Sequence, residues 1–225
     1  LEGASVFVTL EPCAHQGLTP SCAKALAQLP IRRVVYGLKD PNPLVDGGGL
    51  KILRAAGITC EASKLPQLRF ENLAEHFLVN MSEHRAFVSI KIGMSIDGGT
   101  AMKSGESQWI TCPTARNYGH YLRAGHDAIA VGWKTIFKDN PRLNVRHEDF
   151  PNKRTKLVIL GLNKDLESNF EKFKFWKQHK SEDIYFVVRG KSSLLPESCQ
   201  QIVSPLTKEG AFDCKQLSKI LFKEC

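Results

Sequence analysis

Two cysteines early in the chain, Cys13 and Cys22, have the spacing and setting of a thiol pair that shares a metal ion. Cys13 follows Pro12 at the end of a predicted strand, and Cys22 begins a predicted helix after a Pro-Ser dipeptide. The free N–H groups and dipole of a helix N-terminus favour a thiolate. Two thiolates can share Zn²⁺, which needs at least one further ligand and an open water position for catalysis. A pair of structural thiols is the alternative interpretation.

A lysine and a glycine near the middle of the chain form a second candidate group. Lys91 stands in the otherwise apolar stretch 87–93, where a cation is unusual, and it is suited to polarise a substrate oxygen. Gly93 ends the stretch, and its missing side chain lets a cofactor approach the backbone closely. The sequence has no Gly-x-Gly-x-x-Gly fingerprint, which argues against a Rossmann fold.

Apolar runs alternate with helical patterns along the chain and indicate the fold class. The runs that predict strands cover residues 5–10, 33–38, 58–60, 87–93, 128–132, 156–160 and 184–188. Helices are predicted between them, the longest over 66–80 and 113–123. This alternation predicts an α/β fold with mainly parallel sheets.

A polar stretch at residues 81–86 predicts a domain boundary. We expect a first domain over residues 1–82 and a second over 83–225. Residues 163–183 are rich in lysine and glutamate and are interpreted as a solvated helix or loop face. Beyond Lys191 the pattern is weak, and no closing element is predicted.

The net charge and the cysteine content of the chain indicate which binding partners and which cellular compartment to expect. Lysine and arginine outnumber the acids by 31 to 23, a net charge of +8 that suits nucleic acid or phosphorylated small molecules. The lysine-rich stretch 170–180 carries compensating glutamates, so no nucleic-acid partner is expected. No run approaches the roughly 20 apolar residues of a membrane span, so no membrane partner is expected. Seven cysteines without a disulfide framework or secretion signal favour the cytoplasm.

The segment at residues 10–22, which reads LEPCAHQGLTPSC, resembles the zinc-binding stretch of the bifunctional riboflavin biosynthesis deaminase/reductase family. The Asp-Pro-Asn-Pro turn at residues 40–43 and the glycines Gly47 and Gly49 are similar to that family too. The resemblance implies that the first domain is part of a cytidine-deaminase-like α/β/α domain. It also implies Zn²⁺ at Cys13 and Cys22.

The resemblance places two further residues of the deaminase centre upstream of Leu1. They are the third zinc ligand, a histidine in a His-Ala-Glu motif, and the glutamate that carries protons during deamination. His15 is interpreted as a substrate contact or, equally, as a loop histidine. We therefore expect weak zinc binding, and a chain that is truncated at its start.

Four stretches of the second half are similar, in order, to the reductase domain of the same family. They lie at residues 88–101, 104–111, 122–124 and 139–146. The resemblance implies a dihydrofolate-reductase-like α/β domain that binds NADPH. The family's glycine-rich loop for the cofactor phosphates has no counterpart beyond Lys191, so we expect this domain to be incomplete as well.

The resemblance also assigns site residues. It places NADPH against Gly93, Trp109, Thr135, Asp139 and Gly161, the last standing where the family has a serine. It places the phosphorylated pyrimidine substrate against Ser107, Arg123, Leu143 and Arg146, and makes Lys91 the candidate catalytic residue. Without the resemblance, Trp109 is better interpreted as a core residue, Thr135 and Asp139 as a helix and its cap, and Arg123 as a helix C-terminal cation.

The family's two reactions define the expected function. They are the deamination of 2,5-diamino-6-ribosylamino-4(3H)-pyrimidinone 5′-phosphate and the NADPH-dependent reduction of 5-amino-6-(5-phosphoribosylamino)uracil to the ribityl product. We expect an incomplete form of this zinc hydrolase and oxidoreductase, compatible with a homo-oligomer through the reductase domain. Two alternatives stay open: a catalytically dead remnant that binds ligand, and a basic nucleic-acid-binding deaminase.

Overall fold

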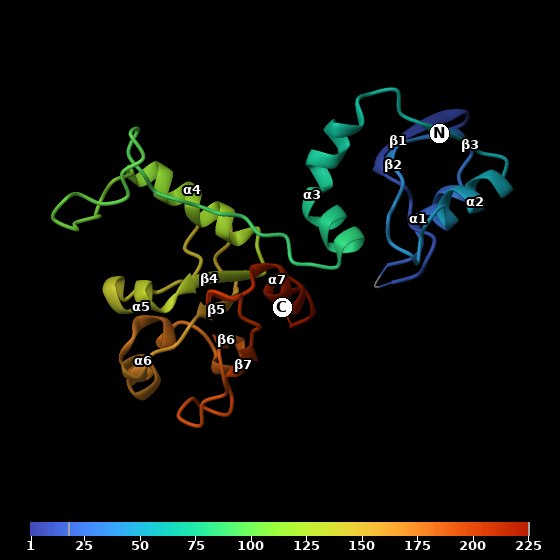
Figure 1. Cartoon of the computed structure of the whole chain (residues 1–225). Coiled ribbons are helices and arrows are strands. Elements are labelled where there is room, and N and C mark those ends of the chain that lie inside the picture. Colours follow the sequence, from blue (N-terminus) through green and yellow to red (C-terminus); the bar gives the residue numbers. More distant parts are fainter. Residues whose placement is uncertain (18, 225) are drawn as a thin grey trace. The chain divides into compact units, whose positions relative to one another are not determined.

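The structure is a computed structural model that describes residues 1–17 and 19–224. It divides into two compact units, Leu1–Phe87 (unit 1) and a second that begins at Val88 (unit 2). Each unit is built on a parallel sheet of its own (Figure 1). The predicted α/β class with parallel sheets is confirmed.

Unit 1 is a three-stranded parallel sheet with three helices. Its strands are β1 (Ala4–Leu10), β2 (Ile31–Leu38) and β3 (Thr59–Ala62), in the order β1-β2-β3. Its helices are α1 (Cys22–Ala27), α2 (Gly48–Ala55) and α3 (Gln67–Glu83). Val34 of the central strand is fully buried, in one cluster with Ala23 of α1 and Leu53 of α2. This packing positions the loop between β1 and α1, which carries both candidate zinc ligands.

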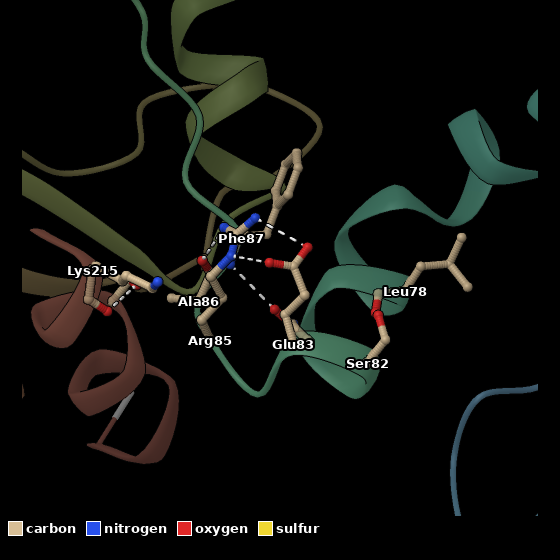
Figure 2. Close-up of polar contacts among 9 residues, drawn as sticks. Leu78, Ser82, Glu83, Arg85, Ala86, Phe87 and Lys215 are labelled. Carbon is tan, nitrogen blue, oxygen red and sulfur yellow. Dashed lines mark hydrogen bonds and ion pairs between the residues drawn. The ribbon is translucent and has the colours of Figure 1, made fainter.

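Short-range polar contacts shape the chain where it leaves α3 (Figure 2). The Arg85 guanidinium pairs with the Glu83 carboxylate at 2.8 Å, which lowers the pKa of Glu83. The Phe87 N–H donates to Asn80 Oδ1 at 3.2 Å. The helix ends at His84, whose φ of 50° is left-handed. The polar stretch that predicts a boundary is thus partly the last turn of α3 and partly this turn.

Unit 2 contains a four-stranded parallel sheet. Its strands, in the order β4-β5-β6-β7, are β4 (Ala128–Gly132), β5 (Lys156–Leu160), β6 (Ile184–Val188) and β7 (Gln200–Val203). Its helices are α4 (Pro113–Ala124), α5 (Trp133–Asp139), α6 (Lys164–Asn169) and α7 (Cys214–Glu224). Three short 3₁₀ turns, η1 (Phe170–Lys172), η2 (Lys174–Lys177) and η3 (Ser181–Asp183), connect α6 to β6.

The two faces of the unit 2 sheet are buried in different cores. On β5, Leu157 and Ile159 belong to a cluster with Ile136 of α5 and Phe175 of η2, all fully buried. Val158 belongs instead to a cluster with Leu217 of α7. Because successive side chains of a strand point to opposite faces, β5 is apolar from Leu157 to Leu160, as is typical of a strand in a parallel sheet.

The structure corrects three expectations. The stretch 87–93 forms no strand, because no described strand pairs with it, and Ile90 is 81% exposed. Residues 163–183 are more than a solvated face, since Leu166 and Phe175 are both fully buried there. Beyond Lys191 the chain forms β7 and α7, which the weak periodicity did not indicate. Among the described helices, none is both long and apolar enough to cross a membrane.

Candidate functional site

Two arginines of unit 2 meet around one backbone segment. Arg123 lies in the last turn of α4, and its guanidinium donates to the Asn144 carbonyl at 2.7 Å. Arg146 donates to the Asn144 side-chain oxygen at 2.6 Å. Arg146 lies only 2 positions from Asn144 in the chain, whereas Arg123 lies 21 positions away, so the fold brings Arg123 to this segment. The sequence predicts both as phosphate ligands, and the structure places them side by side.

A histidine that the sequence did not single out completes this group. The Arg146 N–H donates to His120 Nδ1 at 3.2 Å, so the neutral ring carries its proton on Nε2. That nitrogen lies 3.1 Å from Arg146 Nη2, so two N–H groups face each other. An acceptor that lies beside both nitrogens would satisfy both donors. The available signal was the position of His120 on the same helix as Arg123, less than one turn away.

The electrostatics of the group favour an anion. Burial, and then the neighbouring charges of Arg123, Arg146, His147 and Lys91, together lower the pKa of His120 to about 4. Burial and then Arg146 lower the pKa of Arg123. Among the described residues, no carboxylate forms an ion pair with either arginine. We call Lys91, His120, Arg123 and Arg146 the cationic cluster.

Lys91 reaches the cluster from the extended segment that follows unit 1. A Cβ on Gly119 of α4 would lie 3.4 Å from Lys91 Cε, and one on Gly93 would lie 3.8 Å from Lys91 Nζ. The lysine stem thus crosses α4 where glycine leaves room. The other two predicted substrate residues lie differently. Leu143 is buried in the core, and its φ of 57° is left-handed. Ser107 is half-buried in the loop that leads to Trp109.

A cleft of about 540 Å³ opens at the carboxyl ends of β5 and β6, and we call it the carboxyl-end cleft. Gly161 lies in its wall with a φ of +83°, and a Cβ there would be 2.8 Å from the Trp133 ring. Arg189 and Lys191 follow β6 and also line it. Sequence reasoning found Gly161 but not these cations, although Arg-Gly-Lys directly after a strand was a usable signal.

The other predicted cofactor residues are spread over unit 2 and do not line the carboxyl-end cleft. Thr135 and Asp139 are exposed, one turn apart on α5. Trp109 is 70% exposed, and the Arg116 guanidinium lies 4.3 Å above its ring. Lys138 of α5 donates to the carbonyl of Gly105, which ties the helix to the loop that carries Trp109.

The thiol pair of unit 1 comes together, but as a hydrogen-bonded pair. The Cys22 N–H donates to Cys13 Sγ at 3.2 Å, and Ser21 Oγ donates to the Cys13 carbonyl at 2.7 Å. The hydrogen bond with Cys13, and then burial, raise the pKa of Cys22, against the predicted thiolate. Within the described ranges no three His, Cys, Asp or Glu side chains are placed to hold a metal. These residues do not fit a zinc centre.

The loop that carries the thiols is held by a buried carboxylate. Glu11 is 3% exposed and accepts from the N–H groups of Gly47 and Leu50, each at 3.2 Å. A Cβ on Gly49 would lie 1.7 Å from the Pro12 carbonyl oxygen, so only glycine allows this approach. Gly49 and Glu11 therefore position the residue just before Cys13.

The architecture of unit 2 defines a class of protein. A parallel α/β sheet with a basic cleft at the carboxyl ends of its strands is typical of proteins that bind nucleotides or other phosphorylated ligands. The model of the RibD C-terminal domain family matches residues 86–203. The chain belongs to this family.

Curated relatives agree with the family. Riboflavin biosynthesis protein RibD of Haemophilus influenzae is 45% identical over 150 residues, which are 67% of this chain and 40% of the relative. The Escherichia coli protein of the same name is 46% identical over 145 residues, 64% of this chain and 39% of the relative. The chain thus spans about two fifths of the length of these relatives.

Solved structures match both units. The diaminohydroxyphosphoribosylaminopyrimidine deaminase/5-amino-6-(5-phosphoribosylamino)uracil reductase of Thermotoga maritima gives a TM-score of 0.79 at 30% identity, over 99% of this chain and 59% of that one. Acinetobacter baumannii RibD, form 1, gives 0.78 at 33% identity, over 99% of this chain and 60% of that one.

Proposed function

We propose that unit 2 supplies the cofactor- and phosphate-binding part of an NADPH-dependent reductase of riboflavin biosynthesis. Its substrate would be 5-amino-6-(5-phosphoribosylamino)uracil, as in the name of the Thermotoga maritima relative. The observation that carries the proposal is the cationic cluster, in which two arginines and a neutral histidine converge without a carboxylate partner. Guanidinium groups form charge-assisted, bidentate bonds to phosphate, and Arg123 and Arg146 are assigned to the 5′-phosphate.

The chain offers a place for the cofactor. NADPH supplies a hydride when bound. The carboxyl-end cleft fits its adenosine end, because Arg189 and Lys191 provide cations for phosphate and Gly161 leaves the cleft open beside the Trp133 ring. Thr135, Asp139 and Trp109 are proposed for the nicotinamide side.

Lys91 is proposed to act on the sugar. Its ammonium belongs to the same cluster as the phosphate ligands, so a substrate held by its 5′-phosphate presents ribose oxygens to Lys91. A cation at that position favours ring opening by polarising the ribose oxygen. The exposed position of Lys91 leaves it accessible to substrate.

Unit 1 is proposed as the counterpart of the cytidine-deaminase-like domain of these relatives. Its sheet of parallel strands and its Cys13–Cys22 pair support this assignment. Two thiols fill at most half of a tetrahedral zinc shell, so we assign no deamination step to this chain. The homo-oligomer and the absence of a nucleic-acid partner stay predictions.

The test is substrate binding by the full chain and by an Arg146→Ala variant. Loss of a charge-assisted contact costs about 1.5–3 kcal/mol, so affinity for the phosphorylated pyrimidine should fall by roughly 10- to 150-fold. Affinity for the dephosphorylated analogue should stay within about twofold, and isothermal titration calorimetry measures both. Equal weakening of the two ligands would show that Arg146 does not bind the phosphate.

A further inference from the structure

A second cleft of unit 2, of about 240 Å³, lies at the opposite edge of the sheet from the carboxyl-end cleft. Thr155 directly precedes β5 and Asp183 directly precedes β6, so both mark the amino ends of these parallel strands. We call it the amino-end cleft. Neither Arg123 nor Arg146 lines it, and none of the residues predicted from the sequence does.

The inner wall of the amino-end cleft holds a polar atom that no described residue satisfies. Thr155 is only 4% exposed, and among the described residues its hydroxyl has no hydrogen-bond partner. The His179 ring also lines the cleft; burial lowers its pKa, while the backbone of Thr155, Arg142 and Leu143 and the charge of Asp183 raise it. Buried hydroxyl groups are nearly always hydrogen-bonded in folded proteins, so the Thr155 hydroxyl calls for a ligand or ordered water.

The remaining wall is strongly basic. Lys153, Arg154 and Lys177 line the cleft, and in the part of the chain that the structure describes none of them forms an ion pair. Lys180 also lines it but pairs with Glu182 at 3.2 Å. Among the described residues that line the cleft, Asp183 is the one acid. Water would satisfy the Thr155 hydroxyl but would leave this excess of positive charge uncompensated.

We propose that the amino-end cleft is a second anion site of unit 2 that binds the phosphoryl group of a small molecule. A phosphoryl oxygen accepts from the Thr155 hydroxyl and from lysine and arginine at once. The volume of the cleft is below the roughly 300–1,000 Å³ of sites for drug-sized ligands. The site therefore suits inorganic phosphate or a small phosphate ester rather than a dinucleotide.

The site is separate from the cationic cluster but adjoins it through one residue. Asn144 turns its carbonyl and its Oδ1 to Arg123 and Arg146, while its Nδ2 donates to Gln178 Oε1 at 3.0 Å in the wall of the amino-end cleft. A binding experiment must therefore show which residues contact the phosphate, and not only how many phosphate ions bind.

The experiment is a ¹⁵N NMR titration of the full chain with inorganic phosphate, and in a second arm with glycerol 3-phosphate, at constant ionic strength. Saturable shifts of the Thr155 and His179 amides are expected. Tighter binding of the ester would identify a metabolite as the source of the phosphoryl group, and equal or tighter binding of phosphate would identify the free ion. Shifts confined to Arg123 and Arg146 would overturn the proposal.

Variants separate a built site from general attraction to positive charge. Arg154→Gln with Lys177→Gln should weaken phosphate binding at Thr155 at least tenfold. Lys208→Gln with Lys219→Gln removes the same charge from exposed positions outside the cleft and should change it less than twofold. If both double variants lost phosphate affinity equally, the proposal would be overturned.

A third variant tests the hydroxyl itself. Thr155→Val removes an unpartnered buried hydroxyl, so the phosphate-free chain should melt at a higher temperature. Its phosphate affinity should fall at least threefold, because the ligand loses a donor. A stabilised variant with unchanged affinity would show that Thr155 does not contact the anion and would refute the site.

Discussion

Gly49→Ala is predicted to disrupt the loop that carries the thiol pair of unit 1. The added methyl would lie 1.7 Å from the Pro12 carbonyl oxygen, whereas real contacts stay at 3.0 Å or more, so the loop must move by about 1.3 Å. Such a shift stretches the bonds from the N–H groups of Gly47 and Leu50 to Glu11, which are already 3.2 Å long.

The size of the effect follows from three contributions. Overpacking costs about 1–3 kcal/mol, and losing one hydrogen bond to a carboxylate costs about 1.5–3 kcal/mol. Alanine has a higher helix propensity than glycine, so the substitution inside α2 also stabilises the helix by about 1 kcal/mol. Gly49→Ala should therefore lower the free energy of opening of unit 1 by about 1.5–5 kcal/mol.

Hydrogen exchange measured by mass spectrometry on β2 tests this value. A loss of about 3 kcal/mol speeds exchange of the β2 amides by roughly 100-fold. Gly48→Ala, one residue earlier, places its methyl 3.0 Å from the Ala14 methyl and should change the same free energy by at most about 1 kcal/mol. All three tryptophans lie in unit 2, so their fluorescence should report unchanged unfolding there. If the β2 amides exchanged equally fast in Gly49→Ala and Gly48→Ala, the reasoning would be refuted.

Three further predictions concern the core, the cationic cluster and the thiols. Phe175→Ala empties a fully buried site and should cost unit 2 about 3–5 kcal/mol in urea unfolding followed by tryptophan fluorescence; a cost under 1 kcal/mol would contradict its place in the core. The ring of His120 should titrate by NMR near pH 4, and because its folded pKa lies below the ordinary 6.5, its contribution to stability is complete above pH 6.5 and is lost as the pH falls toward 4; a midpoint above 6 would disprove the cluster's electrostatics. Metal analysis of the purified chain should find well under one zinc per chain, whereas stoichiometric zinc that disappears in Cys22→Ser would reveal ligands beyond the two thiols.

Local sequence patterns were sufficient to predict most strands of both sheets. The runs that became β5 and β6 are apolar and β-branched, and burial on both faces of a parallel sheet requires that composition. The stretch 87–93 is also rich in β-branched residues, although Ser89, Lys91 and Gly93 alternate with them. It forms no strand, because a strand needs a neighbour and the sequence pattern does not supply one. The burial of Phe175 could not be predicted, because a single buried aromatic residue in a lysine-rich stretch produces no hydrophobic periodicity.

The candidate sites were also only partly predictable from the sequence. Arginine is a common phosphate ligand, so Arg123 and Arg146 could be predicted from their residue type and from the family resemblance. His120 and Thr155 could not be predicted, because a histidine or threonine becomes distinctive only through what surrounds it in space. The unpartnered hydroxyl of Thr155 and the lowered pKa of His120 are properties of the fold. No spacing rule along the chain encodes them.

Part of the positive charge of the chain lies where ligands would meet unit 2. Cations belong to the cationic cluster and line the carboxyl-end cleft and the amino-end cleft. A nucleic-acid surface would also need exposed aromatic rings between the cations, on which bases stack. In the lysine-rich stretch the rings turn inward instead: Phe175 is fully buried, and Phe170 stacks edge-on against Trp176 beside the same core. The rings of this stretch therefore offer no platform on which bases could stack, and the absence of a nucleic-acid partner stays a prediction. The cations of the clefts suit the small phosphorylated ligands that the proposed reductase function requires.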